Sequence, residues 1–202
     1  MDPTIELALD EAPRFVSRGG EKLAGALDAF GIDPSGEVCL DVGASTGGFT
    51  DCLLQRGASR VYALDVGRGQ LAETLRNDPR VVSMERTHAS RLDASSDDPL
   101  ALAVVDVSFI SLTRILRGIA RWVVPGGAIV PMVKPQFELG PPDVPRGVVR
   151  DPARRAVAVA RVREHAEGLG LACLAEVESP LIGPSGNHEF FLHLRVAGSS
   201  SR

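Results

Sequence analysis

The chain has 202 residues, of which 44% are hydrophobic and 24% are charged, and its formal net charge at pH 7 is −4. This length and composition predict one globular domain with a substantial core. No stretch approaches the roughly 20 apolar residues that cross a bilayer, so the sequence excludes a membrane-spanning protein and favours a cytoplasmic one without a membrane partner. The negative charge gives no global attraction for a polyanion, so any nucleic-acid binding would depend on a local basic face.

Three cysteines, Cys39, Cys52 and Cys173, are too far apart and too few for a zinc site or a disulfide framework. We expect reduced, mostly buried thiols and no metal.

Only two of the 22 basic residues are lysines, Lys22 and Lys134. In a chain this rich in arginine, a lysine suggests a position that needs an amine able to release its proton, which a guanidinium does not do. Composition alone leaves chance as an equal explanation. The surroundings of the two lysines therefore decide the matter.

Apolar segments of strand length alternate with segments of helical period, which is typical of β-α units around a mostly parallel sheet. Leu23, Leu27 and Phe30 share one face of a first helix, which Gly31 is placed to end. Strands are expected at Val38–Val42, 60–65, Val81–Met84, 102–107 and 128–133. Helices are expected at 48–56, 70–76 and 112–123.

A proline-rich loop at 135–149 follows the fifth strand. It is expected to form either a lid beside the bound substrate or an ordinary surface loop. A long helix at 152–169 begins with proline in its first turn. Strands at 171–177 and 189–196 are separated by a turn-rich segment too short for a crossover helix, so they should pair antiparallel. The predicted fold is α/β, with a seven-stranded, mostly parallel Rossmann-like sheet and an antiparallel last strand.

A glycine-rich segment at 39–49 places Asp41 at the end of a hydrophobic strand, followed by three glycines where the backbone turns into a helix. Glycine lets a ligand approach the main chain closely. Asp65, at the end of the second strand, can accept hydrogen bonds from both hydroxyls of an adenosine ribose. The two features together predict an adenosine cofactor.

The spacing of the glycines indicates which cofactor this is. Gly43 is followed by Gly47 and Gly48, which differs from the G-x-G-x-x-G of dinucleotide-binding folds. A carboxylate at Asp41 would repel a pyrophosphate and would suit the ammonium group of a methionine moiety, so S-adenosyl-L-methionine is favoured over a nicotinamide dinucleotide. A glycine turn that serves only strand-to-helix packing is the remaining alternative. The candidate cofactor-binding residues are Asp41, Gly43, Ala44, Ser45, Thr46, Gly47, Gly48, Phe49, Asp65, Val66, Glu85 and Asp106.

Four charged residues are expected to meet at one edge of the sheet, because ligands of open parallel sheets bind outside the carboxyl ends of the strands. Asp106 and Lys134 lie at the ends of the fourth and fifth predicted strands, and Glu189 opens the antiparallel seventh at the same edge. Lys22 lies in the helix before the first strand. These groups would surround a methyl acceptor, and a structural ion-pair network is the competing interpretation.

Eight motifs occur in order along the chain, at residues 17–23, 41–52, 65–71, 77–81, 106–112, 133–138, 147–152 and 186–190. Together they resemble the TlyA/haemolysin-A family of rRNA 2′-O-methyltransferases. The resemblance implies an FtsJ-like methyltransferase domain at 14–196, S-adenosyl-L-methionine as cofactor, and rRNA or a ribosomal subunit as partner. It also implies that the Lys-Asp-Lys-Glu tetrad of FtsJ-like enzymes falls on the four charged residues reached from the strand ends, Lys22, Asp106, Lys134 and Glu189.

Two departures from this family stand out. Members usually carry a small RNA-binding domain ahead of the catalytic one, and here only a linker-like segment at 1–13 would correspond to its end. The family often has asparagine where this chain has His88, in a region expected near the adenine. Residues 197–202 are expected to form a disordered tail. The sequence does not indicate the oligomeric state.

Lys134 is the candidate base, because a ribose hydroxyl is a poor nucleophile until its proton is removed. Asp106 and Glu189 are expected to orient the two amines and the hydroxyl. The arginines of the long predicted helix should form a solvated face or at best contact phosphate; they are Arg154, Arg155, Arg161 and Arg163.

Two alternatives remain open. In base N-methylation, Phe109 could stack a base, although Phe109 and Trp122 are more readily explained as core aromatics. A non-catalytic module that binds S-adenosyl-L-methionine and acts through protein contacts is the other. Attack on a cytosine carbon would need a cysteine near the methyl group, and no cysteine lies at the end of the fourth strand.

Overall fold

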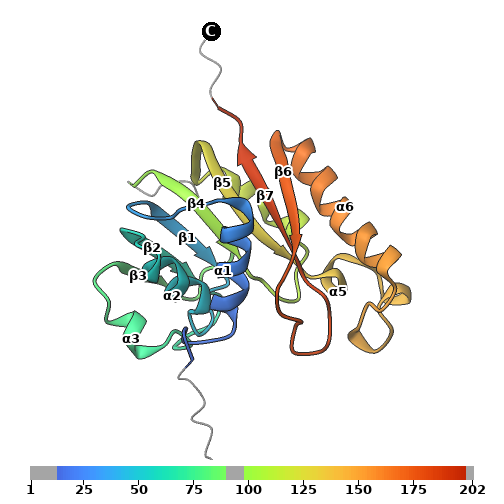
Figure 1. Ribbon diagram of the computed structural model, residues 1–202, viewed down its shortest axis with the longest axis horizontal. Helices are drawn as coiled ribbons and strands as arrows, with labels where there is room; N and C mark the ends of the chain where they lie inside the picture. The colour runs from blue at the N-terminus through green and yellow to red at the C-terminus, as the bar shows by residue number, and fades with distance from the viewer. Residues whose placement is uncertain (1–12, 90–97, 199–202) are drawn as a thin grey trace, which may run out of the picture.

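The computed structural model describes residues 13–89 and 98–198 of the chain. Within these ranges, seven strands form one sheet in the order β3-β2-β1-β4-β5-β7-β6 (Figure 1). The strands are β1 Val38–Val42, β2 Arg60–Leu64, β3 Val81–Met84, β4 Leu100–Val105, β5 Val123–Val133, β6 Leu171–Glu178 and β7 Phe190–Val196. All neighbours pair in parallel except β7, which is antiparallel to both β5 and β6. The predicted fold class is therefore confirmed.

Helices cover both faces of this sheet, and α1 and α2 lie in front of the strands in Figure 1. The helices are α1 Gly19–Phe30, α2 Gly48–Gln55, α3 Glu73–Arg76, α4 Leu116–Ala120, α5 Pro135–Glu138 and α6 Pro152–Gly168. The part of the chain that the structure describes also contains the 3₁₀ turns η2 Leu112–Arg114, η3 Pro141–Asp143 and η4 Pro145–Gly147. Two apolar clusters fill the space on the two sides, one under α1 and α2 and one under α4 and α6. Because both faces are covered, β1 and β4 are apolar and buried along nearly their whole length.

Several expected boundaries were wrong around the fifth strand. The helix expected at 112–123 is η2 followed by the short α4, and β5 begins at Val123 instead of at residue 128. Val123 pairs with Leu100 before a register shift restores regular pairing from Leu102. This pairing keeps Pro125 and the two glycines after it within the strand, although their sequence is typical of a turn.

Other departures are smaller. The helix expected at 70–76 forms only over Glu73–Arg76, and the loop expected at 135–149 contains α5 and two 3₁₀ turns. β2 ends one residue earlier than expected, and β4 begins and ends two residues earlier, so Asp65 and Asp106 directly follow their strands. Most of the predicted linker at 1–13 and of the tail at 197–202 lies outside the described residues. Within residues 13–89 and 98–198, no helix has the length and apolar character needed to cross a bilayer.

Candidate active site

Two adjoining cavities open at the carboxyl edge of the parallel strands. The first has a volume of about 250 Å³ and is lined by residues that include Lys22, Asp106, Lys134 and Glu189. The second has a volume of about 760 Å³ and is lined by Asp65 and Val66 on one side and by residues that follow β4 on the other. Gly43, Ser45 and Asp106 line both, so the two cavities share a wall.

The four predicted catalytic residues meet in the first cavity as two ion pairs. Lys134 Nζ lies 2.5 Å from Asp106 Oδ1, and Lys22 Nζ donates to Glu189 Oε2 at 2.5 Å. Lys22 and Glu189 are buried, with 7% and 2% of their surface exposed, whereas Lys134 and Asp106 are partly exposed. The structure therefore brings together four side chains that are up to 167 residues apart in the sequence.

Strand directions explain why these side chains meet. Asp106 follows β4 and Lys134 follows β5, which run in parallel, while Glu189 precedes β7, which runs the opposite way. The α1 helix reaches this edge with its first turn, which holds Lys22. Phe15 packs directly on this turn at Gly20, where a Cβ atom would lie 2.2 Å from Cγ of Phe15.

Ser108 adds a neutral group to this cluster. Lys134 Nζ donates to Ser108 Oγ at 3.0 Å, so the amine of Lys134 has one carboxylate and one hydroxyl partner. Sequence reasoning missed Ser108 as a site residue, although it lies in the motif that follows Asp106. The signal that could have found it is its position two residues beyond a strand-end carboxylate.

The glycine-rich segment forms the wall between the cavities. Gly43 has φ +88°, and a Cβ atom there would lie 2.2 Å from the Asp106 carbonyl oxygen, so only glycine allows β1 and β4 to end this close together. Of the other predicted residues in this segment, Ala44, Ser45, Thr46, Gly48 and Phe49 line the first cavity. Gly47 does not, since its α-carbon faces Leu71 and Leu75 on the other side of the loop.

Asp65 is held firmly at the edge of the second cavity. Its two carboxylate oxygens accept hydrogen bonds from the backbone N–H groups of Ser45, at 2.8 Å, and Gly67, at 2.7 Å. Val66 beside it is 64% exposed. The carboxylate thus has a fixed orientation, and each oxygen retains a lone pair for a ligand.

Two predicted cofactor ligands lie away from the cavities. Asp41 is completely buried beneath the glycine-rich segment and accepts a hydrogen bond from Thr50 Oγ1 at 2.7 Å. Burial raises the pKa of Asp41 to about 7. Glu85 Oε1 accepts from the Gly69 N–H at 2.7 Å and lines neither cavity. Contact of either carboxylate with a cofactor remains a prediction.

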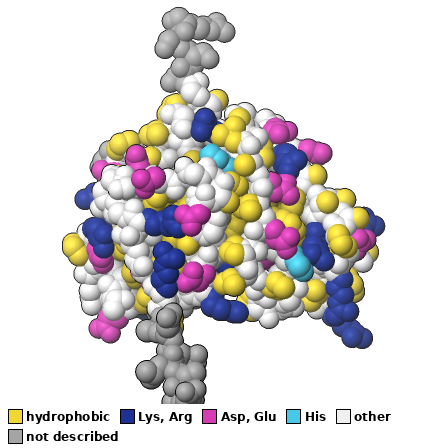
Figure 2. Space-filling view, in the orientation of Figure 1, with side chains coloured by type: hydrophobic (Ala, Val, Ile, Leu, Met, Phe, Trp, Pro, Cys, Tyr) yellow, Lys and Arg dark blue, Asp and Glu magenta, His cyan; other side chains and the backbone are white. Residues whose placement is uncertain are grey.

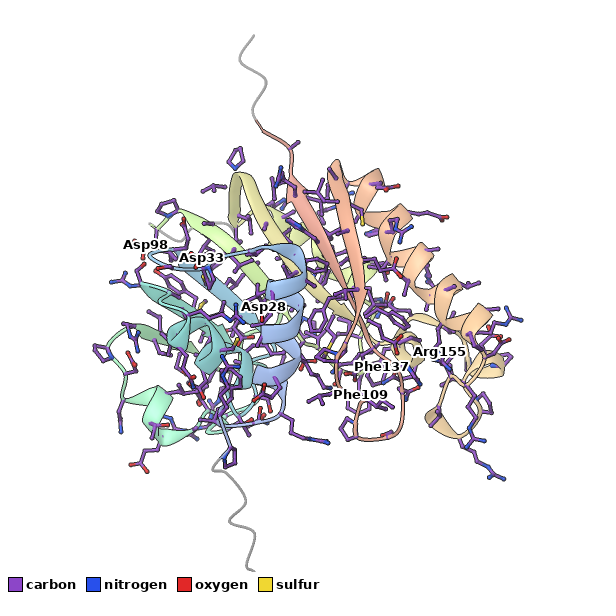
Figure 3. The ribbon with its side chains drawn as sticks, viewed as in Figure 1. Asp28, Asp33, Asp98, Phe109, Phe137 and Arg155 are labelled. Atoms are coloured by element: carbon purple, nitrogen blue, oxygen red, sulfur yellow. The ribbon has the colours of Figure 1, made fainter. Side chains whose placement is uncertain are left out.

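Phe109 contradicts the interpretation as a core aromatic, because it is 90% exposed. It lines the second cavity and has φ +65°, a backbone conformation that aromatic residues rarely adopt. Its ring lies 5.1 Å from the ring of Phe137, centroid to centroid, and Figure 3 labels both residues close together in the lower half of the molecule. Trp122, by contrast, packs partly buried against the core, as expected. His88 lines the second cavity, where an adenine contact is expected.

The arginines of α6 form ion pairs and hydrogen bonds with other residues of the chain. Arg154 pairs with Asp143 and Arg163 with Glu176, while Arg155 and Arg161 donate to the backbone carbonyls of Arg150 and Glu138. The helix therefore has less free positive charge than its sequence suggests.

The segment 135–149 lines neither cavity. The end of this segment is hydrogen-bonded to Asn187, whose side chain accepts from the Val149 N–H at 2.9 Å and donates to the Gly147 carbonyl at 2.8 Å. This arrangement favours the ordinary surface loop over the lid.

Comparison with known proteins places the chain in a family. Residues 15–196 match the FtsJ-like methyltransferase family. The chain is 51% identical over 194 residues to the 16S/23S rRNA (cytidine-2′-O)-methyltransferase TlyA of Mycobacterium tuberculosis, covering 95% of this chain and 72% of that protein. It is 35% identical over 184 residues to the 23S rRNA (cytidine-2′-O)-methyltransferase TlyA of Campylobacter jejuni, covering 89% of this chain and 70% of that protein.

A solved structure agrees with this grouping. A Lactococcus lactis protein that carries the hemolysin name superposes with a TM-score of 0.89 at 42% identity, covering 93% of this chain and 91% of the other. With the cavities, the paired lysines and carboxylates and these relatives all in agreement, the chain belongs to the FtsJ-like methyltransferases.

Proposed function

We propose that this chain transfers a methyl group from S-adenosyl-L-methionine to a ribose 2′-hydroxyl of rRNA in the cytoplasm. The observation that carries the proposal is the pairing of two lysines with two carboxylates in the cavity that adjoins the Asp65 cavity. The relatives named as rRNA (cytidine-2′-O)-methyltransferases supply the substrate class.

The second cavity fits an adenosyl group. The fixed carboxylate of Asp65 can accept hydrogen bonds from the two ribose hydroxyls. Val66, Val107 and Ile110 offer apolar contacts for a flat base. Gly43, Ser45 and Asp106, which line both cavities, would hold the methionine moiety of this cofactor. When bound, the cofactor would supply a methyl group on a positively charged sulfur.

Lys134 acts as the base in this proposal. When deprotonated, its amine would accept the proton of the 2′-hydroxyl as the hydroxyl oxygen bonds to the methyl carbon. The bond from that carbon to sulfur would break at the same time, and its electron pair would leave with the sulfur as S-adenosyl-L-homocysteine. Asp106 would then stabilise the resulting ammonium. Ser108 fixes the direction of the amine. Lys22 and Glu189 form the opposite, more deeply buried pair and orient the acceptor, which matters because in-line displacement depends on alignment.

The exposed ring of Phe109 supports a nucleic-acid acceptor. Its position on the loop that carries Asp106 and Ser108 places an aromatic surface beside the reacting groups. Unpaired bases of RNA stack on such rings, with roughly 1–3 kcal/mol per base. Stacking of the target base there would leave its ribose free to enter the first cavity.

The test is methyl transfer to ribosomal subunits and to naked rRNA. The protein is incubated with S-adenosyl-L-methionine carrying a labelled methyl group, and the label is mapped to ribose or base. Label on a ribose 2′-oxygen is expected. Bound cofactor without any transfer would favour the non-catalytic module, and label on a base would contradict the ribose assignment.

Replacement of Lys134 by arginine tests the base directly. Lys134→Arg keeps the positive charge beside Asp106 but provides no group that can lose its proton at neutral pH, so transfer should fall by roughly 100-fold or more. Cofactor affinity, measured by calorimetry, should stay close to that of the wild type. A variant with wild-type turnover would remove the base assignment.

A cysteine-based mechanism is disfavoured by the same structure. Burial raises the pKa of the Cys39 thiol to about 12 and that of Cys52 to about 11, so neither supplies a thiolate at neutral pH. Cys173 lies on β6 and lines neither cavity.

A further inference from the structure

Two segments of the chain run side by side at the active site. The first, the acceptor loop, comprises residues 106–112 after β4, and the second is Lys134 with the short helix α5, Pro135–Glu138, that follows it. At one end Lys134 contacts Asp106 and Ser108, as described above. In the middle the rings of Phe109 and Phe137 meet.

Glu138 makes the contact at the other end. Its Oε2 accepts from Ser111 Oγ at 2.6 Å, and its Oε1 accepts from the Leu112 N–H at 2.9 Å. The carbonyl oxygen of Glu138 in turn accepts from Arg161 of α6 at 2.6 Å. The acceptor loop is therefore bonded at both ends to residues of one five-residue segment.

The burial of Glu138 shows that these bonds matter. Only 3% of the residue is exposed, and burial raises its pKa, while the bonds from Ser111 and Leu112 oppose that shift. A buried carboxylate costs free energy unless its oxygens are hydrogen-bonded, and here each oxygen has a partner from the acceptor loop. An apolar side chain could fill the same space but could not hold the loop.

The stretch between the two ends needs such support. Phe109 projects almost wholly into solvent at φ +65°, a conformation that for a bulky side chain persists only when the surrounding structure imposes it. Asp106 and Ser108, which contact Lys134, lie in the same stretch. A loop released at its Ser111 end could relax and carry these groups away from the amine.

We infer that Glu138 is a positioning residue of the transfer reaction, which fixes the acceptor loop against the Lys134 segment so that Asp106, Ser108 and Phe109 keep their places. The inference rests on the function proposed above. Glu138 lines neither cavity, so it acts through the loop and not by contact with the substrate.

The experiment compares three variants, Glu138→Ala, Glu138→Gln and Ser111→Ala, with the wild type. At saturating cofactor, Glu138→Ala should lower kcat by roughly 10- to 100-fold, since small misplacements of reacting groups have effects of that size. Glu138→Gln keeps an acceptor for the Leu112 N–H, so its kcat should fall less than that of Glu138→Ala. Ser111→Ala keeps the bond between Glu138 and the Leu112 N–H, so its kcat should also fall less, although it loses the bonds of Ser111 Oγ to Glu138 and to Thr113. The double variant Glu138→Ala with Ser111→Ala should lower kcat by less than the product of the two single effects, because both changes remove the bond between Ser111 and Glu138.

Hydrogen exchange gives a readout independent of activity. The amides of residues 107–112, followed by mass spectrometry, should exchange about tenfold faster in Glu138→Ala, because the Leu112 N–H loses its acceptor. Asp151→Ala is the matched control. It removes the Asp151 carboxylate that caps α6 through the Ala153 N–H and should lower the melting temperature, yet leave kcat and exchange of the loop unchanged.

Several outcomes would overturn the inference. Wild-type kcat in Glu138→Ala, or a reduced kcat with unchanged exchange in residues 107–112, would each do so. If Glu138→Ala does not fold, wild-type kcat in both Glu138→Gln and Ser111→Ala would be decisive against it. Failure of the wild-type protein to methylate any RNA would contradict the proposed function, and the exchange measurement would still decide whether Glu138 holds the loop.

Discussion

At the scale of single residues, Asp41 shows how burial changes the chemistry of a group that the sequence marks as important. Its carboxyl group is completely buried, with Thr50 as its hydrogen-bond donor, and its pKa rises from 3.8 to about 7. Between these two pH values the folded chain holds a proton that the unfolded chain has released. The stability contribution of Asp41 therefore decreases as the pH rises from about 4 to about 7.

Asp41→Asn should remove this dependence. The asparagine side chain can still accept from Thr50 and does not ionise, so the variant should gain stability relative to the wild type as the pH rises, by at most roughly 4 kcal/mol at pH 8. Urea unfolding of both proteins from pH 5 to pH 8 measures this difference. A difference that stays constant over that range would show that Asp41 is already ionised in the folded chain.

At the scale of elements, the loop between β6 and β7 positions Glu189. Pro180 of this loop packs against Gly25 of α1, and the Gly183 N–H donates to the Asn187 carbonyl at 2.9 Å. Gly183 has no room for a side chain, since a Cβ atom there would lie 2.6 Å from Glu189 Oε1. The loop thus holds the carboxylate against Lys22 by close packing.

Gly183→Ala should displace Glu189 and lower kcat by roughly 10- to 100-fold, because the Lys22–Glu189 pair would lose its geometry. Gly140→Ala is the control, since its Cβ atom would meet nothing closer than 3.7 Å and its φ is negative. Steady-state methyl transfer by the two variants tests the expectation. Equal rates would mean that Glu189 tolerates movement and does not orient the acceptor.

The elements also show what pattern can predict. β1 and β3 occur at the expected residues. β1 was predictable because a buried parallel strand is marked by an apolar run. The boundary between α4 and β5 was missed, since the early start of β5 depends on the pairing of Val123 with Leu100, a contact absent from any local window. Phe109 was assigned to the core because aromatics usually lie there, whereas the hydrogen bonds at the two ends of its loop expose it.

At the scale of the whole molecule, charge has to be placed locally for RNA to bind. Basic and acidic side chains are interspersed over the face shown in Figure 2, in keeping with a net charge of −4. Arg18 is exposed and lines the first cavity, whereas Arg121 is exposed at the opposite edge of the sheet, just before β5. The two arginines therefore differ in position but not in charge.

Charge reversal at these positions tests where RNA docks. Arg18→Glu should weaken rRNA binding severalfold and reduce the salt dependence of the affinity by about one counterion, whereas Arg121→Glu, with the same net charge, should bind like the wild type. Filter binding at several salt concentrations measures both effects. Equal weakening by the two changes would indicate that net charge, and not the cavity edge, controls binding.

The sequence by itself determined the sheet, the cofactor class and the four charged residues, because apolar runs mark buried strands and the carboxyl ends of parallel strands share one edge. Only the tertiary structure decided the direction that each side chain takes at that edge. It buried Asp41, turned Glu85 toward Gly69, exposed Phe109 and bonded Glu138 to the acceptor loop. Those outcomes depend on hydrogen bonds and packing between segments far apart in the chain, and no local pattern records such contacts.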